Sequence, residues 1–275
     1  MREVVNVISF ANSELAHSVR RFSKQMSALD PMSTITIYNE HSVPPEYLGK
    51  FRDVFDRNQR GFGYYSWKPA IILDCLEKLP DGALVMYSDI GNHVNIHGQS
   101  MYHRLFAVLD TLDVPIIANQ IATSKFNERR YTKGDVIDYF SVRNNDCIID
   151  SGQFQSGMIF FRKCDKSMEF MRRWYQVLDC GIRLFDDSPS VSPCFPEFIE
   201  HRHDQSAFSI LCKIYGLYGI PEYLFYVNDS KKRDEIRFSP ILNLRDTNGS
   251  IPFDTLSHLR LFKHRIKACV SGRCR

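Results

Sequence analysis

The hydrophobic pattern of the first 40 residues predicts a strand, a helix and a second strand. Residues 4–10 form an apolar run typical of a buried strand, and residues 34–38 form a second, β-branched one. The helix between them has one apolar face, which consists of Leu15, Val19, Phe22 and Met26. Asn12 or Ser13 is a suitable cap for its first turn. Strands that are connected through helices build parallel sheets, so we expect an α/β fold.

The same patterns predict the elements that follow. Helices are expected at 69–79, 99–112, 165–180 and 203–215, and strands at 83–87, 115–118, 153–162 and 223–227. Pro69 suits the first position of its helix, and Gly181 ends the helix before it. Residues 119–150 and 183–200 are polar and read as irregular segments. No internal repeat, low-complexity stretch or linker interrupts the chain, so we expect a single domain over residues 1–275.

Composition excludes several classes of protein. The chain is 44% hydrophobic with a net charge of only +3, which excludes a disordered polypeptide. No apolar run approaches the roughly 20 residues of a membrane-spanning helix, and the charged N-terminus does not read as a signal peptide. The eight cysteines are irregularly spaced without a CxxC pair, which favours reduced thiols over a zinc site. We therefore expect a cytoplasmic protein.

Basic side chains are concentrated at the C-terminal end. Residues 260–275 contain no acidic side chain and six basic ones: Arg260, Lys263, Arg265, Lys267, Arg273 and Arg275. Without them, the rest of the chain carries more acidic than basic side chains, which argues against nucleic-acid binding. The tail can make a peripheral contact with an anionic lipid surface or another anionic partner. A solvated, frayed terminus is the alternative.

Asp89 is the first candidate for chemistry. It follows the apolar strand at 83–87 directly, and open α/β sheets place their ligand-binding groups at the carboxyl ends of strands. An aspartate there can hold Mn²⁺ or Mg²⁺, which would neutralise a diphosphate and improve it as a leaving group. The alternative is an aspartate that satisfies backbone N–H groups in a turn.

Two other charged residues have a functional and a structural interpretation. Lys68 near a helix start can contact a diphosphate as a point charge, or it can point into water. Asp204 lies at the predicted start of the helix at 203–215. There it can contact a sugar hydroxyl, accept a proton or stabilise positive charge at an anomeric carbon, or it can cap the helix.

Three segments together resemble one family. They are RGFGYYSWKPAIILDCLEKLPDGALVMYSDIG (60–91), FQSGMIFFRKCDKSMEFMRRWY (154–175) and EHRHDQSAFSILCKIYG (200–216). In this order and spacing they resemble nucleotide-sugar-dependent glycosyltransferases with the GT-A fold, of the bacterial surface-polysaccharide type. The resemblance spans about residues 4–227. It implies a mixed, mainly parallel sheet flanked by helices, with a nucleotide-sugar half over about 1–100 and an acceptor half over about 101–275.

The resemblance also implies roles for individual residues. The donor is expected to contact Phe10, Asn12, Arg60, Trp67, Lys68, Ser88 and Asp89. The acceptor is expected to contact Gln155, Ser156, Gly157, His203 and Gln205. Asp204 would be the catalytic residue, and Asp89 and His264 would be the metal ligands. One departure is that Tyr87 occupies the first position of the Asp-x-Asp metal motif, so a single carboxylate remains.

The function that these segments indicate is transfer of a sugar from a nucleotide diphosphate to a saccharide acceptor, in surface polysaccharide assembly. A lipid-linked acceptor is compatible with the basic tail. A sugar nucleotidyltransferase would carry a glycine-rich, basic loop after its first strand, whereas residues 10–13 have neither a glycine nor a basic residue. A non-catalytic carbohydrate-binding protein is the other alternative. The degenerate Tyr87 position permits it, and the presence of both Asp89 and Asp204 argues against it.

Overall fold

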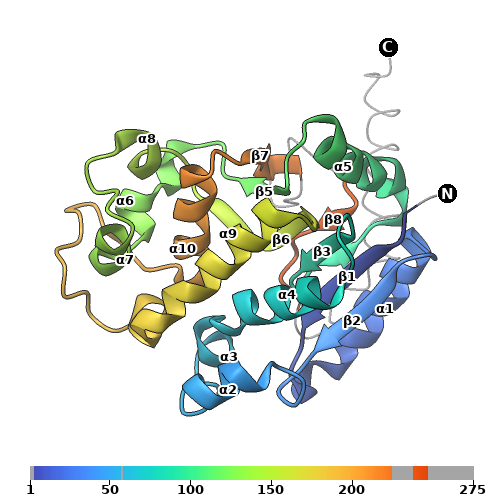
Figure 1. Ribbon diagram of the computed structural model, residues 1–275, viewed down its shortest axis with the longest axis horizontal. Helices are drawn as coiled ribbons and strands as arrows, with labels where there is room; N and C mark the ends of the chain where they lie inside the picture. Colours follow the sequence, from blue (N-terminus) through green and yellow to red (C-terminus); the bar gives the residue numbers. More distant parts are fainter. Residues whose placement is uncertain (1–2, 57, 225–237, 247–275) are drawn as a thin grey trace, which may run out of the picture.

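A mixed sheet of six strands forms the centre of the computed structural model (Figure 1). The structure describes residues 3–56, 58–224 and 238–246. The strands are β1 (Val5–Phe10), β2 (Thr34–Tyr38), β3 (Leu84–Ser88), β5 (Ile116–Gln120), β6 (Phe154–Arg162) and β7 (Tyr218–Pro221). They lie in the order β2-β1-β3-β6-β5-β7. β6 runs antiparallel to β3 and β5, and the other neighbouring pairs are parallel.

The central strands are apolar on both faces because helices cover both faces of the sheet. Along β1, Val5 and Val7 face one core while Ile8 and Phe10 face the other, as the alternation of a strand requires. β3 is buried at each of its five residues. Because β3 is covered on both sides, its carboxyl end is held in place. Asp89 is the first residue after that end.

Helices form one layer on each face of the sheet (Figure 1). One layer consists of α1 (Ala16–Leu29) and α5 (Gln99–Thr111). The other contains α4 (Trp67–Lys78), α9 (Asp165–Gln176) and α10 (His203–Ile214). The short elements are α2 (Pro45–Phe51), α3 (Gly61–Tyr64), α6 (Glu128–Tyr131), α7 (Gly134–Tyr139), α8 (Asp146–Ile149), and the ribbon of β4 (His93–Val94) with β8 (Ile241–Leu242). None of the described helices is long and apolar enough to cross a membrane.

The expected architecture is confirmed: a mixed, mainly parallel sheet flanked by helices in a single domain. The predicted strands at 83–87, 115–118 and 153–162 match β3, β5 and β6 to within two residues. The segment 119–150 is not irregular throughout, because it contains α6, α7 and α8. These helices have four to six residues, too few for a hydrophobic period to be visible in the sequence.

Three local predictions were wrong. Pro69 is the third residue of α4, not its first, because the helix already begins at Trp67. The strand expected at 223–227 lies earlier, at Tyr218–Pro221, where it pairs with β5, and residues 222–224 form a 3-10 turn. Residues 225–227 lie outside the described residues. Asn12 precedes a 3-10 turn at Ser13–Leu15 and makes no side-chain capping bond.

A buried ion pair fixes α10 against α6. Glu128 is fully buried at the start of α6, and its Oε1 lies 2.8 Å from Nζ of Lys213 near the end of α10. Ser209 Oγ donates to the same carboxylate, and Gln153 Nε2 donates to it at 2.7 Å. This network joins α6, α10 and the residue that precedes β6. It therefore helps to hold the helix that begins at His203 and Asp204.

Glu128→Gln should lower the free energy of unfolding by about 3 kcal/mol, because it leaves the buried Lys213 ammonium without a counter-ion. Urea denaturation of the full chain measures the loss. Asp146→Asn is the control, since the Asp146 side chain is 82% exposed and pairs with Arg129 at 3.7 Å, where surface ion pairs contribute little. Equal stability of the two variants would show that this pair does not hold α10.

Candidate functional site

Three charged side chains meet beyond the carboxyl end of β3. Lys68 Nζ lies 2.8 Å from Asp204 Oδ2 and 3.4 Å from Asp89 Oδ1. It also donates to Ser156 Oγ at 3.2 Å, and that hydroxyl donates to Asp204 Oδ2 at 2.7 Å. We call Lys68, Asp89, Asp204 and Ser156 the charge cluster. It brings together four of the residues that the sequence singled out.

The members of the charge cluster differ in exposure. The side chains of Lys68 and Asp204 are 3% and 5% exposed, whereas that of Asp89 is 47% exposed. Lys68 is the second residue of α4, Asp89 follows β3, and Asp204 is the second residue of α10. The cluster therefore joins two helices and the central strand. It presents only one carboxylate to solvent.

An unusual turn precedes α4. Each residue from 61 to 65 has a positive φ: Gly61 57°, Phe62 58°, Gly63 93°, Tyr64 58° and Tyr65 59°. This left-handed conformation is unfavourable for residues with a side chain, and such strain is concentrated at functional sites. Here it places the Tyr65 ring 5.5 Å from Lys68 Nζ. A Cβ on Gly61 would lie 2.4 Å from the same ring, so this position requires glycine.

Tyr87 orients Asp89. Its hydroxyl donates to Asp89 Oδ1 at 2.7 Å, and its ring lies 5.2 Å from Lys68 Nζ. Burial, with a contribution from Asp89, holds the pKa of Tyr87 well above its usual range, so the phenol stays a neutral donor. Tyr87 stands where the resemblance implied a first aspartate, and its hydroxyl supports Asp89. Asp89 Oδ2 lies against Gly157, where a Cβ would come within 2.8 Å of it.

The two buried charges influence each other. Burial raises the pKa of Asp204, and the neighbouring Lys68 and Ser156 oppose that effect. Burial alone would lower the pKa of Lys68, but Asp204 and Asp89 outweigh it and the net shift is upward. Lys68 therefore stays protonated between the carboxylates. With both aspartates ionised, the cluster carries one excess negative charge, which favours a cation beside the exposed Asp89.

The described residues provide few ligands for a metal ion. They contain no group of three His, Cys, Asp or Glu side chains that could hold one. Asp89 offers one carboxylate, and His264, the other expected ligand, lies outside the described residues. Mg²⁺ is commonly bound through one or two carboxylates together with substrate phosphates. The site therefore fits a divalent ion that brings diphosphate oxygens with it.

Asp204 does not cap α10. The N-cap residue is Arg202, which makes no side-chain capping bond, and the Asp204 carboxylate bonds to Lys68 and Ser156 instead. The capping interpretation of this residue is therefore wrong. Its carboxylate belongs to the charge cluster.

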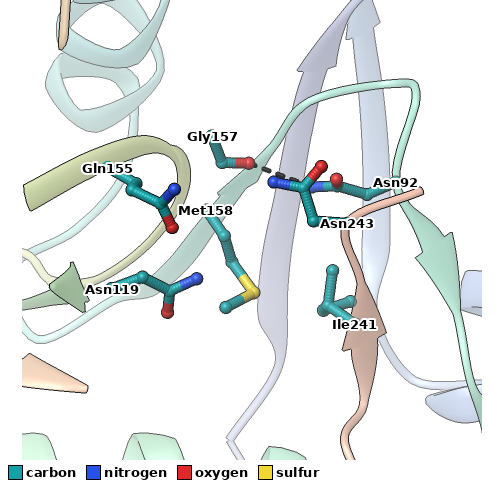
Figure 2. A pocket seen from close by; sticks show the side chains of 7 residues that line it. All are labelled: Asn92, Asn119, Gln155, Gly157, Met158, Ile241 and Asn243. Carbon is teal, nitrogen blue, oxygen red and sulfur yellow. Dashed lines mark hydrogen bonds between the residues drawn. The ribbon is translucent and has the colours of Figure 1, made fainter. Parts of the chain in front are cut away.

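Gln155 and Gly157 line a small pocket beside the charge cluster (Figure 2). Its other described lining residues are Asn92, Asn119, Met158, Ile241 and Asn243. The three asparagines are not among the site residues expected from the sequence. The pattern did contain one indication of Asn119, because a polar pair, Asn119 and Gln120, directly follows an apolar strand. Asn92 and Asn243 reach the pocket only through tertiary structure.

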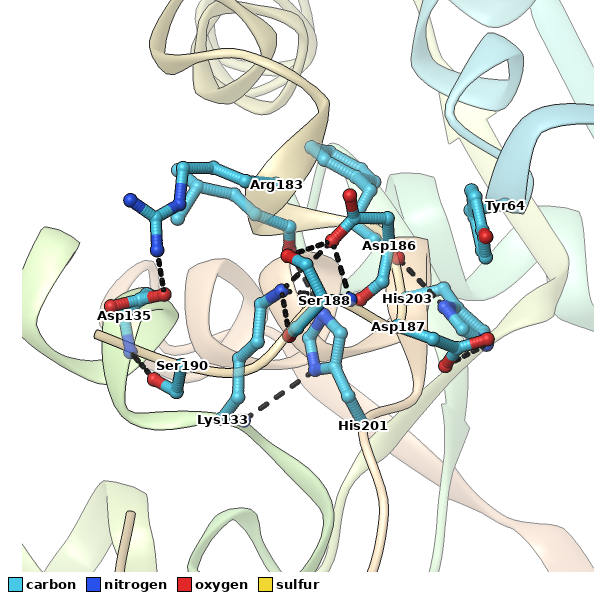
Figure 3. Close-up of polar contacts among 12 residues, drawn as sticks. Tyr64, Lys133, Asp135, Arg183, Asp186, Asp187, Ser188, Ser190, His201 and His203 are labelled. Carbon is cyan, nitrogen blue, oxygen red and sulfur yellow. Dashed lines mark hydrogen bonds and ion pairs between the residues drawn. The ribbon is translucent and has the colours of Figure 1, made fainter. Parts of the chain in front are cut away.

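His203 lies in a separate polar group, together with Asp187 (Figure 3). Its Nδ1 is 2.7 Å from the Phe185 carbonyl oxygen, so Nδ1 carries the proton and Nε2 is the acceptor in the neutral ring. Nε2 is buried without a hydrogen-bond partner among the described residues, and Asp187 Oδ1 is 3.7 Å away. Arg60 Nη1 lies 4.0 Å from that same carboxylate oxygen. Arg60 and His203 are thus brought near each other by Asp187.

The remaining expected donor residues take part in packing. Phe10 and Trp67 are both buried and stack on each other, with ring centroids 4.0 Å apart. Trp67 Nε1 donates to the Gly61 carbonyl at 2.9 Å. Ser88 Oγ accepts from Asn92 Nδ2 at 3.0 Å. Asn12 is partly exposed just beyond the carboxyl end of β1.

Gln205, an expected acceptor residue, is tied to the network that holds α10. Its Nε2 donates to Gln153 Oε1 at 2.9 Å, and Gln153 donates to Glu128. The side chain remains partly exposed. Gln205 therefore follows Asp204 in the sequence, but its side chain is hydrogen-bonded to the Glu128 network and not to the charge cluster.

Several glycosyltransferases are among the solved structures to which the chain is similar, all at low identity. Mouse xyloside xylosyltransferase 1 is 9% identical with a TM-score of 0.46, over 84% of this chain and 90% of that chain. A glycosyltransferase involved in the glycosylation of the major capsid of PBCV-1 is 12% identical with a TM-score of 0.49, over 90% and 100%. Core-mannan synthase A from Aspergillus fumigatus, in a Mn/GDP form, is 8% identical with a TM-score of 0.45, over 77% and 70%.

No protein-family model and no curated protein matches the chain.

Lys68→Met should lower the free energy of unfolding by about 3 kcal/mol at pH 7, because Asp204 would be buried without its cation. Losing that cation raises the pKa of Asp204 further above its unfolded value. A group with a raised folded pKa stabilises the fold at low pH, and this contribution disappears as the pH rises through that pKa. The loss should therefore be smaller at pH 5 than at pH 7 in urea titrations.

Lys50→Met is the matched control for this prediction. Lys50 pairs with Asp179 at 2.9 Å, but its side chain is 53% exposed, so little change is expected at either pH. If Lys68→Met lowers the free energy of unfolding equally at both pH values, the loss does not come from an Asp204 carboxylate that is buried without a counter-ion.

Proposed function

We propose that the chain is a nucleotide-sugar-dependent glycosyltransferase of the GT-A type, which moves a sugar from a nucleotide diphosphate to a saccharide acceptor. One observation carries the proposal. At the carboxyl end of the central strand, a half-exposed Asp89 is oriented by Tyr87 and by a buried Lys68 that also holds Asp204. Open α/β sheets bind their ligands at such strand ends.

In this proposal, about residues 1–100 bind the nucleotide-sugar donor. Asp89 would hold Mn²⁺ or Mg²⁺ together with the donor diphosphate, and the bound ion would neutralise the leaving group. Lys68 lies behind Asp89 with 3% of its side chain exposed, so it acts on the donor through Asp89, as a positioning residue. Arg60 is the exposed cation on this side, and its guanidinium suits a phosphate.

Asp204 is the second carboxylate of the proposed reaction. It would stabilise positive charge that develops at the anomeric carbon, or accept the acceptor proton once its carboxylate, 5% exposed in this structure, is uncovered. Two features support a chemical role. It is buried without capping its helix, and Ser156, which donates to it, is followed by Gly157, which contacts the exposed Asp89.

The acceptor side lies within about residues 101–275. Ser156 belongs to the charge cluster, and Gln155 and Gly157 precede and follow it on β6. Nε2 of His203 has no hydrogen-bond partner among the described residues. Gln205 completes the expected set. We propose a hexosyl or related transfer in the assembly of a surface polysaccharide, in the cytoplasm. The basic tail would bring the enzyme to a lipid-linked acceptor at the membrane surface.

Nucleoside diphosphates should bind more tightly in the presence of Mn²⁺, and Asp89→Asn should reduce that gain at least about tenfold, because it removes the half-exposed carboxylate that the described part of the site offers to the ion. Isothermal titration of UDP and GDP, with Mn²⁺ or with chelator, measures the effect. Asp81→Asn is the control, since Asp81 is 90% exposed at 3.8 Å from Lys163. The same affinities for wild type and Asp89→Asn would remove Asp89 from the donor site.

Asp204→Asn should decrease turnover by a factor on the order of 10²–10⁴, as expected for a lost acid–base group. The variant keeps the shape of the side chain, and Lys68 retains Asp89 as a counter-ion, so circular dichroism should show a folded protein. Release of nucleoside diphosphate from a panel of nucleotide sugars measures turnover. A folded variant with wild-type turnover would leave Asp204 as a purely structural residue. No turnover of any nucleotide sugar by wild type, with carbohydrate binding intact, would favour the non-catalytic alternative.

A further inference from the structure

An arginine from α1 holds the backbone turn that carries Asp89. The turn consists of residues 89–92, directly after β3. Arg21 Nη2 donates to the Ile90 carbonyl at 2.7 Å, and Arg21 Nη1 donates to the Asn92 carbonyl at 2.6 Å. A guanidinium can bind several acceptors at once because its N–H donors form a fixed planar fork. The position of this turn therefore depends on Arg21.

The same guanidinium reaches the last described part of the chain, in which we call residues 239–246 the strap. Arg21 Nη2 also donates to the Asp246 carbonyl at 3.1 Å, and Arg21 Nε lies 3.9 Å from the Asp246 carboxylate. The backbone of the strap bonds to the turn as well, because Asp246 N donates to the Gly91 carbonyl at 2.9 Å. Arg21 thus joins the turn to the strap.

The charges at this junction are buried and balanced. The side chains of Arg21 and Asp246 are 10% and 2% exposed, and His93 Nε2 lies 2.9 Å from Asp246 Oδ2. Val94 N donates to Gln25 Oε1, so Gln25 Nε2 donates to His93 Nδ1 and the ring proton lies on Nε2. Burial, with a contribution from Arg21, lowers the pKa of His93, so the ring is neutral. Arg21 and Asp246 are therefore each other's counter-ions.

The strap is seated by close backbone contacts. A Cβ on Gly98 would lie 2.3 Å from Pro240 Cα, so the strap can pass only over a glycine there, and Asn95 N donates to the Pro240 carbonyl at 2.7 Å. Figure 2 shows Asn243 of the strap on the same side of the pocket as Asn92. The strap pairs with β4 over only two residues, apart from the six-stranded sheet, so it can open locally while the sheet stays intact.

We propose that Arg21 and the strap position Asp89, so that docking of the strap and binding of a diphosphate with its divalent ion strengthen each other. Lys68 and Tyr87 contact the Asp89 side chain, whereas Arg21 holds its backbone turn from α1, on the opposite face of the sheet from α4. A divalent ion requires its ligand oxygens at defined distances, so a loosened turn offers a weaker ligand. Such coupling between two sites is reciprocal. The diphosphate and its ion rest on the proposed function, and Arg21 acts through Asp89 as a positioning residue.

Isothermal titration of the full chain with UDP and GDP, in Mn²⁺ and in chelator, tests the coupling. Arg21→Lys keeps the charge but loses the planar fork that binds the carbonyls of turn and strap. The gain in affinity from Mn²⁺ should fall about tenfold, as for other groups that orient a metal ligand, while the affinity in chelator should stay near that of wild type. Arg20→Lys is the matched control, because Arg20 is exposed on the same helix, and it should bind like wild type.

Asp246→Asn is a second variant, and it should decrease the same Mn²⁺ gain because it leaves the buried Arg21 without its counter-ion. Should Arg21→Lys fail to fold, this variant takes its place in every measurement.

Hydrogen exchange without any ligand tests the hold of Arg21 on the turn separately. The amides of Asn92 and Asp246 should exchange faster in Arg21→Lys than in Arg20→Lys, while the amides of α9 keep their protection. In wild type, UDP with Mn²⁺ should slow the exchange of the Asp246 amide, as reciprocal coupling requires.

The outcomes separate this proposal from the proposed function. Equal exchange in Arg21→Lys and Arg20→Lys would show that Arg21 does not hold the turn. Faster exchange with an unchanged Mn²⁺ gain would overturn the positioning role and leave donor binding intact. Wild type that binds neither UDP nor GDP would overturn the proposed function and the coupling to a donor, whereas faster exchange in Arg21→Lys would still support the hold on the turn.

Discussion

A lysine ammonium buried between two carboxylates is the interaction on which the site depends. Removing a charge from water is costly, and only closely placed counter-charges and hydrogen bonds offset that cost. Lys68 obtains them from Asp204, Asp89 and Ser156, which lie on three different elements. The fold can therefore keep Lys68 buried only if α4, α10, the carboxyl end of β3 and the amino end of β6 keep their positions relative to one another.

The neighbouring elements are built around that constraint. A left-handed turn places Tyr65 against Lys68, and Tyr87 adds a second ring and a hydroxyl that orients Asp89. The Glu128 network holds α10 from the side away from the cluster. Among the described residues of the site, Asp89 is half-exposed, and Arg60 is exposed beside Asp187.

Local sequence patterns were sufficient for most of the fold. Strands such as β1 and helices such as α5 and α10 were predicted because their apolar periods are continuous. Asp89 and Asp204 were identified because each follows or begins such an element. Short helices such as α6 were missed because four residues show no period.

The contacts within the site were not predictable in the same way, because they join residues far apart in the chain. The sequence suggested Lys68 as a diphosphate contact or a solvated side chain, whereas 88 positions separate it from Ser156, which helps to bury it. Asn119 enters the pocket through a shift in strand pairing that no local pattern records. In the sequence, Tyr87 suggested the loss of an expected carboxylate, and its hydrogen bond to Asp89 is visible only in the structure.

A crystal structure of the chain with a nucleoside diphosphate and Mn²⁺ would test the central claim most directly. The diphosphate and the ion should lie beside Asp89, with Lys68 still buried between Asp89 and Asp204. A diphosphate bound elsewhere on the chain, or an ion held without Asp89, would contradict the claim that this cluster is the donor site of a glycosyltransferase.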